Sequence, residues 1–182
     1  MENQYNKLFF GIIITSVLIN FGFEGSILRS VGYIIVSSAI FNLYEITQNE
    51  CFKKAKLISS FFVIIYILRL TMLTEGIDIF KIIIYEDITT NIIVTLDFIL
   101  FYLVFAGTIQ IIESRNLNSI FIMMSKRLRF YIVFSIITII IFNLSSVFVQ
   151  IDFVLEPLIK YFFAVIRIFL LFNILKLKKT LI

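Results

Sequence analysis

Residues 88–112 read ITTNIIVTLDFILFYLVFAGTIQII, a stretch of 25 residues in which Asp97 is the one charged side chain. About 20 mainly apolar residues are enough to cross a hydrocarbon core of roughly 30 Å as a helix. The stretch is therefore predicted to span a membrane. Asp97 lies about 14 Å from Ile88 at a rise of about 1.5 Å per residue, so the charge falls near the middle of the membrane, where it is most costly.

The rest of the chain has the same apolar character. It has 182 residues, of which 60% are hydrophobic, and a mean hydropathy of +1.05. Soluble domains are closer to 45–50% apolar, and a chain of this size cannot bury the excess within itself. Five more spans are predicted at 8–23, 27–47, 57–74, 130–151 and 154–175. The predicted fold is therefore all-α: residues 1–182 form a single domain, a polytopic bundle of six transmembrane helices.

Charged residues divide between the two sides of this predicted bundle. Of the 16 Lys and Arg residues, eleven fall on one side: Lys7, Lys53, Lys54, Lys56, Arg115, Lys126, Arg127, Arg129, Lys176, Lys178 and Lys179. The opposite loops are mainly acidic, with Glu24, Glu75, Asp78, Glu86, Asp87, Asp152 and Glu156 against Lys81. Because basic loops stay in the cytoplasm, both termini are predicted to be cytoplasmic. The turns at 24–26 and 152–156 and the 75–87 loop are predicted to lie outside.

This topology can be tested by cysteine labelling, because Cys51 is the one native cysteine. An Asp78→Cys variant in a Cys51→Ser background is expected to react with a membrane-impermeant maleimide in intact cells. Reaction at position 78 only after the cells have been permeabilised would contradict the predicted orientation.

The inner connection between the fourth and fifth predicted spans has its own pattern. Apolar residues at 117, 120, 121, 124 and 128 form one helical stripe, which is flanked by Arg115, Lys126, Arg127 and Arg129. Such a pattern is typical of an amphipathic helix lying in the membrane interface on anionic lipid. We therefore expect a separate interfacial helix over about 115–129. It is either a plain surface helix or a coupling helix that docks a partner protein.

Two charges lie too deep to reach water easily. Arg167 is about 16 Å from Glu156 along its predicted span, which matches the depth of Asp97 with the opposite sign. Each should therefore face the bundle interior, and the two are predicted to lie within salt-bridge or one-water distance. Such a pair either fixes helix packing or belongs to a ligand or ion site.

Other polar residues of the spans gather in the half assigned to the outside. They predict an outward-facing polar pocket lined by Arg29, Tyr33, Arg69, Asn91, Asp97, Lys160 and Arg167. An alternative holds for Arg29, Arg69 and Lys160, because each has a long side chain that can extend to the headgroups and place its charge there. Small residues have a packing role as well, and Gly11-x-x-x-Thr15 indicates a close helix contact in the first span.

The sequence carries no signature of an enzyme. It contains no histidine, hence no Ser/His or Cys/His pairing, and we find no metal-ligand cluster, cofactor motif or phosphate loop. The leading hypothesis is a solute-binding or transport subunit that takes a small-molecule or lipid ligand from the outer side. The alternative is a sensor, regulatory or immunity-type protein that detects an extracellular peptide, lipid or antibiotic and signals through its basic inner face.

The expected surroundings follow from the same observations. The bias toward Ile, Phe, Asn and Lys, with few Ala, indicates an AT-rich bacterial genome, so we expect a multi-pass protein of a bacterial cell membrane. Its predicted partners are the lipid bilayer and a cytoplasmic or membrane protein, with no nucleic acid and no cofactor.

In size and number of predicted spans, the chain resembles the substrate-binding subunits of energy-coupling-factor vitamin transporters. Those subunits carry an Ala-x-x-x-Ala contact pattern in the first span, whereas this chain has Gly11-x-x-x-Thr15. The likeness is one of architecture, and no family is assigned from it. It implies that other subunits supply the energy, because the chain has no ATP-binding motif.

Overall fold

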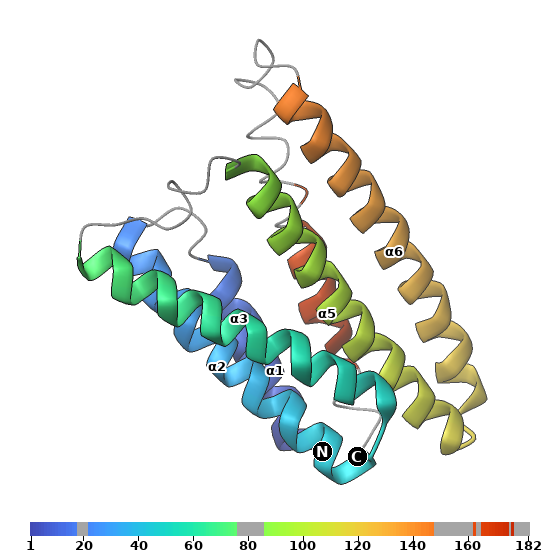
Figure 1. Cartoon of the computed structure of the whole chain (residues 1–182). Helices are drawn as coiled ribbons and strands as arrows, with labels where there is room; N and C mark the ends of the chain where they lie inside the picture. The colour runs from blue at the N-terminus through green and yellow to red at the C-terminus, as the bar shows by residue number, and fades with distance from the viewer. Residues whose placement is uncertain (18–21, 76–85, 148–161, 163–164, 175, 177–182) are drawn as a thin grey trace.

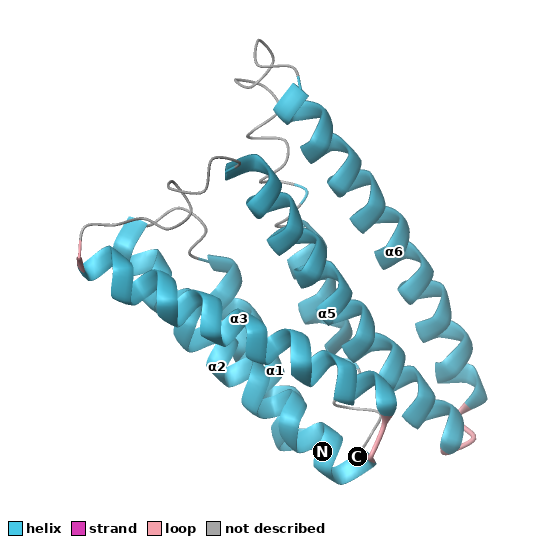
Figure 2. Ribbon diagram, in the orientation of Figure 1, coloured by secondary structure: helices cyan, strands magenta, loops and turns pink. Residues whose placement is uncertain are grey.

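The computed structural model describes residues 1–17, 22–75, 86–147, 162, 165–174 and 176 (Figure 1). These ranges are helical and contain no strand (Figure 2). The helices are α1 (Glu2–Val17), α2 (Gly22–Thr47), α3 (Glu50–Thr74), α5 (Glu86–Ser114) and α6 (Asn118–Val147), followed by a shorter apolar helix, Val165–Ile174.

The helices lie side by side along one direction, and α5 is central to the arrangement. Helix α2 packs between α1 and α3, while α5 contacts both α3 and α6. The N-terminus and the connections α2–α3 and α5–α6 lie at the same end of the bundle (Figure 1). This arrangement agrees with a chain that returns repeatedly to one side of a membrane.

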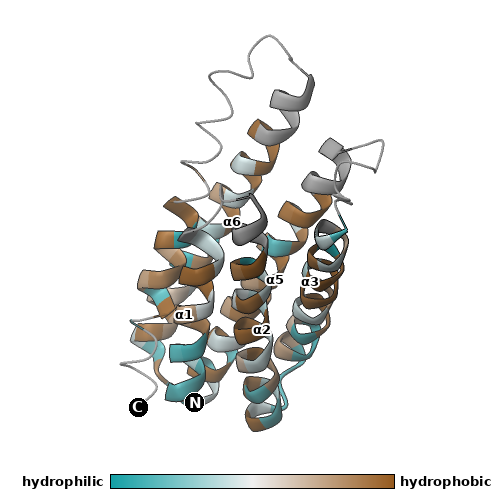
Figure 3. Ribbon diagram, turned by 90° about the vertical axis from the view of Figure 1, so that its left-hand side faces the viewer, coloured by the Kyte–Doolittle hydropathy of each residue, from teal (hydrophilic) through white to brown (hydrophobic). Residues whose placement is uncertain are grey.

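Three of the described helices are long and apolar enough to cross a membrane: Ile27–Thr47, Glu50–Met72 and Ile92–Ser114. Their outer faces expose large apolar side chains such as Leu57 (70% exposed) and Ile64 (58%). Hydrophobic residues run along the helices, and hydrophilic ones gather toward the end near the N-terminus (Figure 3). An exposed apolar surface of this extent needs lipid around it, so the prediction of an all-helical membrane protein is confirmed in this coarser form. Six spans and cytoplasmic termini stay predictions.

Helices α1 and α2 cross at a pair of glycines. A Cβ added to Gly11 would lie 2.6 Å from Val36 Cγ2 and 3.1 Å from the Gly32 carbonyl oxygen. A Cβ added to Gly32 would lie 2.5 Å from Thr15 Cγ2 and 3.1 Å from the Gly11 carbonyl oxygen. The two backbones approach this closely because neither glycine has a side chain. The close contact predicted from Gly11 and Thr15 is therefore confirmed.

Contacts near the end of the bundle that holds the N-terminus place basic residues from three helices at one level of α5 (Figure 1). On α1, Tyr5 hydrogen-bonds Thr108 at 2.9 Å, two residues before Lys7. On α3, Phe52 lies beside Gly107, just before the lysines at 53, 54 and 56. On α6, Tyr131 stacks on Phe105 at 6.3 Å, just after the basic residues at 126, 127 and 129. We call the level of residues 105–108 of α5 the basic level, and positions along α5 are counted from it below.

The predicted separate interfacial helix over 115–129 is wrong. Residues from Asn118 onward are helical, but they form the first turns of one continuous helix that ends at Val147. The apolar stripe explains the continuity, because the buried positions Met124, Tyr131, Ser135 and Thr138 continue it with the same spacing. Helix α6 begins after a turn at 115–117, where Asn116 has a positive φ of 57°, and no glycine or proline interrupts it from Asn118 to Val147.

The other predicted boundaries fare unevenly. Helices α2, α3 and α5 contain the spans predicted at 27–47, 57–74 and 88–112, and α1 begins six residues before position 8. The outer turn predicted at 24–26 is wrong, because those residues belong to α2, which begins at Gly22. Most of the 75–87 loop, the turn at 152–156 and the first part of the span at 154–175 lie outside the described residues.

Candidate functional site

The two deep charges form an ion pair in the interior of the bundle. Arg167 Nη2 donates to Asp97 Oδ2, joining the Val165–Ile174 helix to α5. Asp97 is 4% exposed and Arg167 is 7% exposed, so neither side chain faces lipid. The pairing predicted from their depth and opposite sign is confirmed. Each charge compensates the other in a place where an isolated charge costs about 2.5–3.5 kcal/mol on insertion scales.

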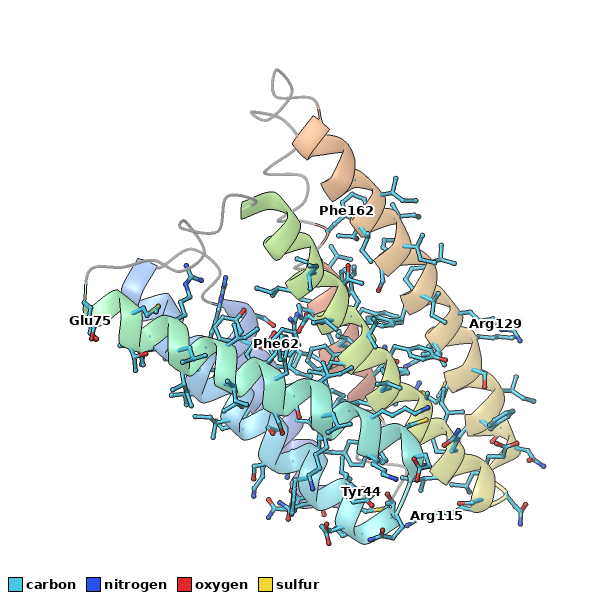
Figure 4. The ribbon with its side chains drawn as sticks, viewed as in Figure 1. Tyr44, Phe62, Glu75, Arg115, Arg129 and Phe162 are labelled. Carbon is cyan, nitrogen blue, oxygen red and sulfur yellow. The ribbon has the colours of Figure 1, made fainter. Side chains whose placement is uncertain are left out.

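Tyr33 of α2 completes this cluster. Its hydroxyl donates to Asp97 Oδ1 at 2.6 Å, so both carboxylate oxygens accept a hydrogen bond. The Tyr33 ring stacks on Phe62 at 4.7 Å and on Tyr66 at 5.0 Å, both on α3. Figure 4 places Phe62 among the densely packed side chains between α3 and α5. The rings of α3 therefore hold the Tyr33 hydroxyl in position against the carboxylate.

Arg167 has a capacity for hydrogen bonding that the cluster does not use. Its guanidinium carbon lies 4.7 Å from the centre of the Phe101 ring, one turn from Asp97 on α5. Its Nη1 atom is buried and has no hydrogen-bond partner among the described residues. A guanidinium has five N–H donors, and leaving a buried donor unpaired costs about 1–3 kcal/mol. The Tyr33–Asp97–Arg167 cluster therefore contains an N–H group, on Arg167 Nη1, that is available to donate to a further acceptor.

The cluster lies within the part of α5 that is long and apolar enough to cross a membrane, Ile92–Ser114. Asp97 is eight residues from Phe105 at the basic level, about 12 Å along α5, and eleven residues from Glu86, about 16 Å. These two lengths add up to roughly the 30 Å of a hydrocarbon core. Asp97 is therefore remote from both ends of α5.

Contacts of the last helix fix the position of Arg167. Six residues further on, the buried Asn173 accepts a 2.5 Å hydrogen bond from Arg127 Nη1 on α6 and donates to the Phe169 carbonyl oxygen at 2.7 Å. Phe169 also packs on Phe130 of α6, with ring centres 5.3 Å apart. These contacts hold the Val165–Ile174 helix against α6, and so set the height at which Arg167 meets α5.

The structure brings together three of the seven residues predicted to bind a ligand: Tyr33, Asp97 and Arg167. Arg29 and Arg69 are partly buried and lie about one turn from Tyr33 and Tyr66 on their own helices, on the side away from the basic level. Asn91 belongs to α5, but its side chain, like all of Lys160, lies outside what the structure describes. For these four residues, a place in the site stays a prediction.

Two aromatic residues that contact the cluster, Phe62 and Phe101, were not singled out from the sequence. Phe62 and Tyr66 are four residues apart on α3, and Phe101 is four residues after Asp97 on α5. That spacing puts each pair on one face of its helix. The signal was present, but Phe residues are so common in this chain, with 22 in total, that it did not stand out.

Comparison with protein-family models, curated proteins and solved structures gives no match for this chain. The arguments about its function therefore rest on the geometry of the cluster.

A Tyr33→Phe variant removes the Tyr33 hydroxyl and keeps the ring. The stacking on Phe62 and Tyr66 stays, whereas Asp97 loses one hydrogen bond. Because hydrogen bonds to charged groups contribute about 1.5–3 kcal/mol, we expect the free energy of unfolding to fall by that order. Denaturant titration in detergent measures it, with Tyr102→Phe as the control, since Tyr102 is 38% exposed and makes no described contact with Asp97. Equal losses in the two variants would show that the Tyr33 hydroxyl is not coupled to Asp97.

Proposed function

We propose that this protein is a membrane-embedded solute-binding or transport subunit whose ligand reaches the Tyr33–Asp97–Arg167 cluster from the outer side. One observation carries the proposal: the buried Nη1 of Arg167 has no partner among the described residues. An ion pair that served packing alone would be expected to satisfy this donor, because buried polar groups are almost always paired. An acceptor atom from a bound solute would satisfy it.

Charge balance restricts the chemistry of that solute. Arg167 is already neutralised by Asp97, and both oxygens of Asp97 are engaged. The atom that meets Nη1 therefore acts as a hydrogen-bond acceptor beside a neutral pair. A carbonyl or hydroxyl oxygen meets this need, and a carboxylate also meets it where Arg29 or Arg69 adds positive charge toward the outer end. The stacked rings of Tyr33, Phe62 and Tyr66 provide an apolar wall next to the donor.

The conservative variant Arg167→Lys tests the proposal. Lysine keeps the positive charge for Asp97 but lacks the second guanidinium nitrogen. We expect wild-type protein, purified after growth in rich medium, to carry a small-molecule adduct in native mass spectrometry, and Arg167→Lys to lack it while unfolding at a similar temperature. The same adduct on both proteins, or no adduct on the wild type at any detergent concentration that keeps it folded, would contradict the proposal.

A sensor or regulatory role is the second candidate, and the continuity of α6 favours it. The exposed residues Lys126 and Arg129 belong to the same helix as Tyr131, whose hydroxyl donates to the Phe98 carbonyl oxygen next to Asp97. A rigid helix of this kind can carry a displacement near the cluster to the basic end. Neighbouring genes distinguish the roles: transporter ATPases favour transport, a kinase or response regulator favours sensing, and a toxin or bacteriocin favours immunity.

A further inference from the structure

A groove runs along the seam between α5 and α6, on the face away from the ion pair. Its volume is about 310 Å³, on the order of ten water molecules at about 30 Å³ each. The α5 wall consists of Thr95, Phe98, Ile99 and Tyr102, and the α6 wall of Tyr131, Ile132, Ser135, Ile136 and Ile139. The lining is almost entirely apolar carbon.

Contacts of Tyr131, which lines the groove, join its two walls. The Tyr131 hydroxyl spans the seam and donates to the Phe98 carbonyl oxygen at 3.1 Å. The Tyr131 ring also packs edge-on against Phe98 at 6.3 Å and lies parallel to Phe105 at the same distance.

Depth indicates what fills the groove. Tyr102 is three residues from Phe105 at the basic level and Thr95 is ten, so the groove covers about 5 Å to about 15 Å along α5 from that level and lies within the candidate span Ile92–Ser114. A groove inside an apolar span faces the acyl chains of the surrounding lipid. The rim residues Ile99 (40% exposed), Tyr102 (38%) and Ile136 (51%) face the surrounding medium.

We propose that this groove is a specific binding site for one acyl chain of a membrane phospholipid. A chain in the groove makes contacts with both walls and the floor, whereas a chain against a convex helix face makes contacts on one side. Within lipid, this difference in van der Waals packing decides which chains stay. The site is separate from the proposed solute site and does not depend on it.

The absence of native tryptophan allows a clean optical test. A single tryptophan is introduced at Ile99, in the groove, and in a second protein at Phe61 of α3, which is 44% exposed. The two positions match in depth: Ile99 is about 12 Å from Gly107, and Phe61 is about 14 Å from Phe52, the residue beside that glycine. Full-length protein is reconstituted in phosphatidylcholine vesicles with an increasing fraction of lipid brominated in mid-chain, and tryptophan quenching is recorded.

We expect the relative association constant for brominated lipid to be about threefold higher for the Ile99→Trp protein than for the Phe61→Trp protein. Adding Ser135→Phe, which fills the groove, should remove the preference, whereas Ser60→Phe on α3 should leave it unchanged. If Ile99→Trp fails to fold, Tyr102→Trp is the second reporter, with Leu57→Trp as its depth-matched control.

Three outcomes would overturn the proposal. Equal quenching at the two depth-matched positions would show ordinary contact with bulk lipid. A preference that survives Ser135→Phe would place the lipid elsewhere. A tryptophan at position 99 that brominated lipid does not quench at all would show that protein covers the groove, such as a second copy of the chain.

Discussion

An Arg167→Leu substitution is expected to lower the free energy of unfolding by about 3–5 kcal/mol, because it leaves the Asp97 carboxylate buried without a counter-charge. Asp97→Asn should have a similar effect by stranding the guanidinium. The control is Arg29→Leu, which should have a smaller effect, since Arg29 is partly buried and lies nearer the end of its helix. Denaturant titration of each purified variant in detergent measures the difference. Equal losses at positions 29 and 167 would contradict the assigned role of the ion pair.

The double variant Asp97→Leu/Arg167→Leu separates packing from binding. Replacing a buried ion pair with apolar residues of similar volume is often neutral or stabilising, so most of the stability should return. If the cluster binds a solute, this folded variant should lose binding and biological activity. A double variant that regains stability and keeps full activity would reduce the pair to a packing element.

The second large effect is expected at the α1–α2 crossing. Gly11→Leu or Gly32→Leu should lower the free energy of unfolding by about 1–3 kcal/mol or prevent folding, because the first added carbon meets backbone as well as side-chain atoms. Gly107→Ala is the control: its Cβ would lie 3.1 Å from the edge of the Phe52 ring, which can shift. Unfolding titrations that rank Gly107→Ala as the more damaging change would contradict the close crossing.

The ion pair was predictable because the depth of each charge can be counted along the sequence. Counting residues from the ends of two apolar stretches gives the depth of Asp97 and Arg167, and cost in lipid requires deep charges to pair. Tyr33 was predictable only as a polar residue on one face of its helix. Its hydrogen bond to Asp97 and its stacking on Phe62 depend on the rotation of α2 against α3 and α5. The arrangement of residues around one helix does not reveal how that helix is rotated against its neighbours.

The inner part of α6 shows a different limit of sequence reasoning. An apolar stripe with flanking lysine and arginine fits an interfacial helix, and it equally fits the end of a long helix that packs on α5. The period of the stripe is the same in both, so hydrophobicity alone does not distinguish them. The two structures differ in tertiary contacts: Met124 and Tyr131 are buried in the bundle core, so the stripe belongs to a long helix that packs on α5.

The most direct test of the central claim is an experimental density map of the wild-type protein, purified from its native membrane in mild detergent. The proposed solute site predicts non-protein density within hydrogen-bond distance of Arg167 Nη1, bounded by Tyr33 and the α3 rings. The claim would be contradicted by a map in which a protein carbonyl or side-chain oxygen occupies that position and no further density lies beside the cluster.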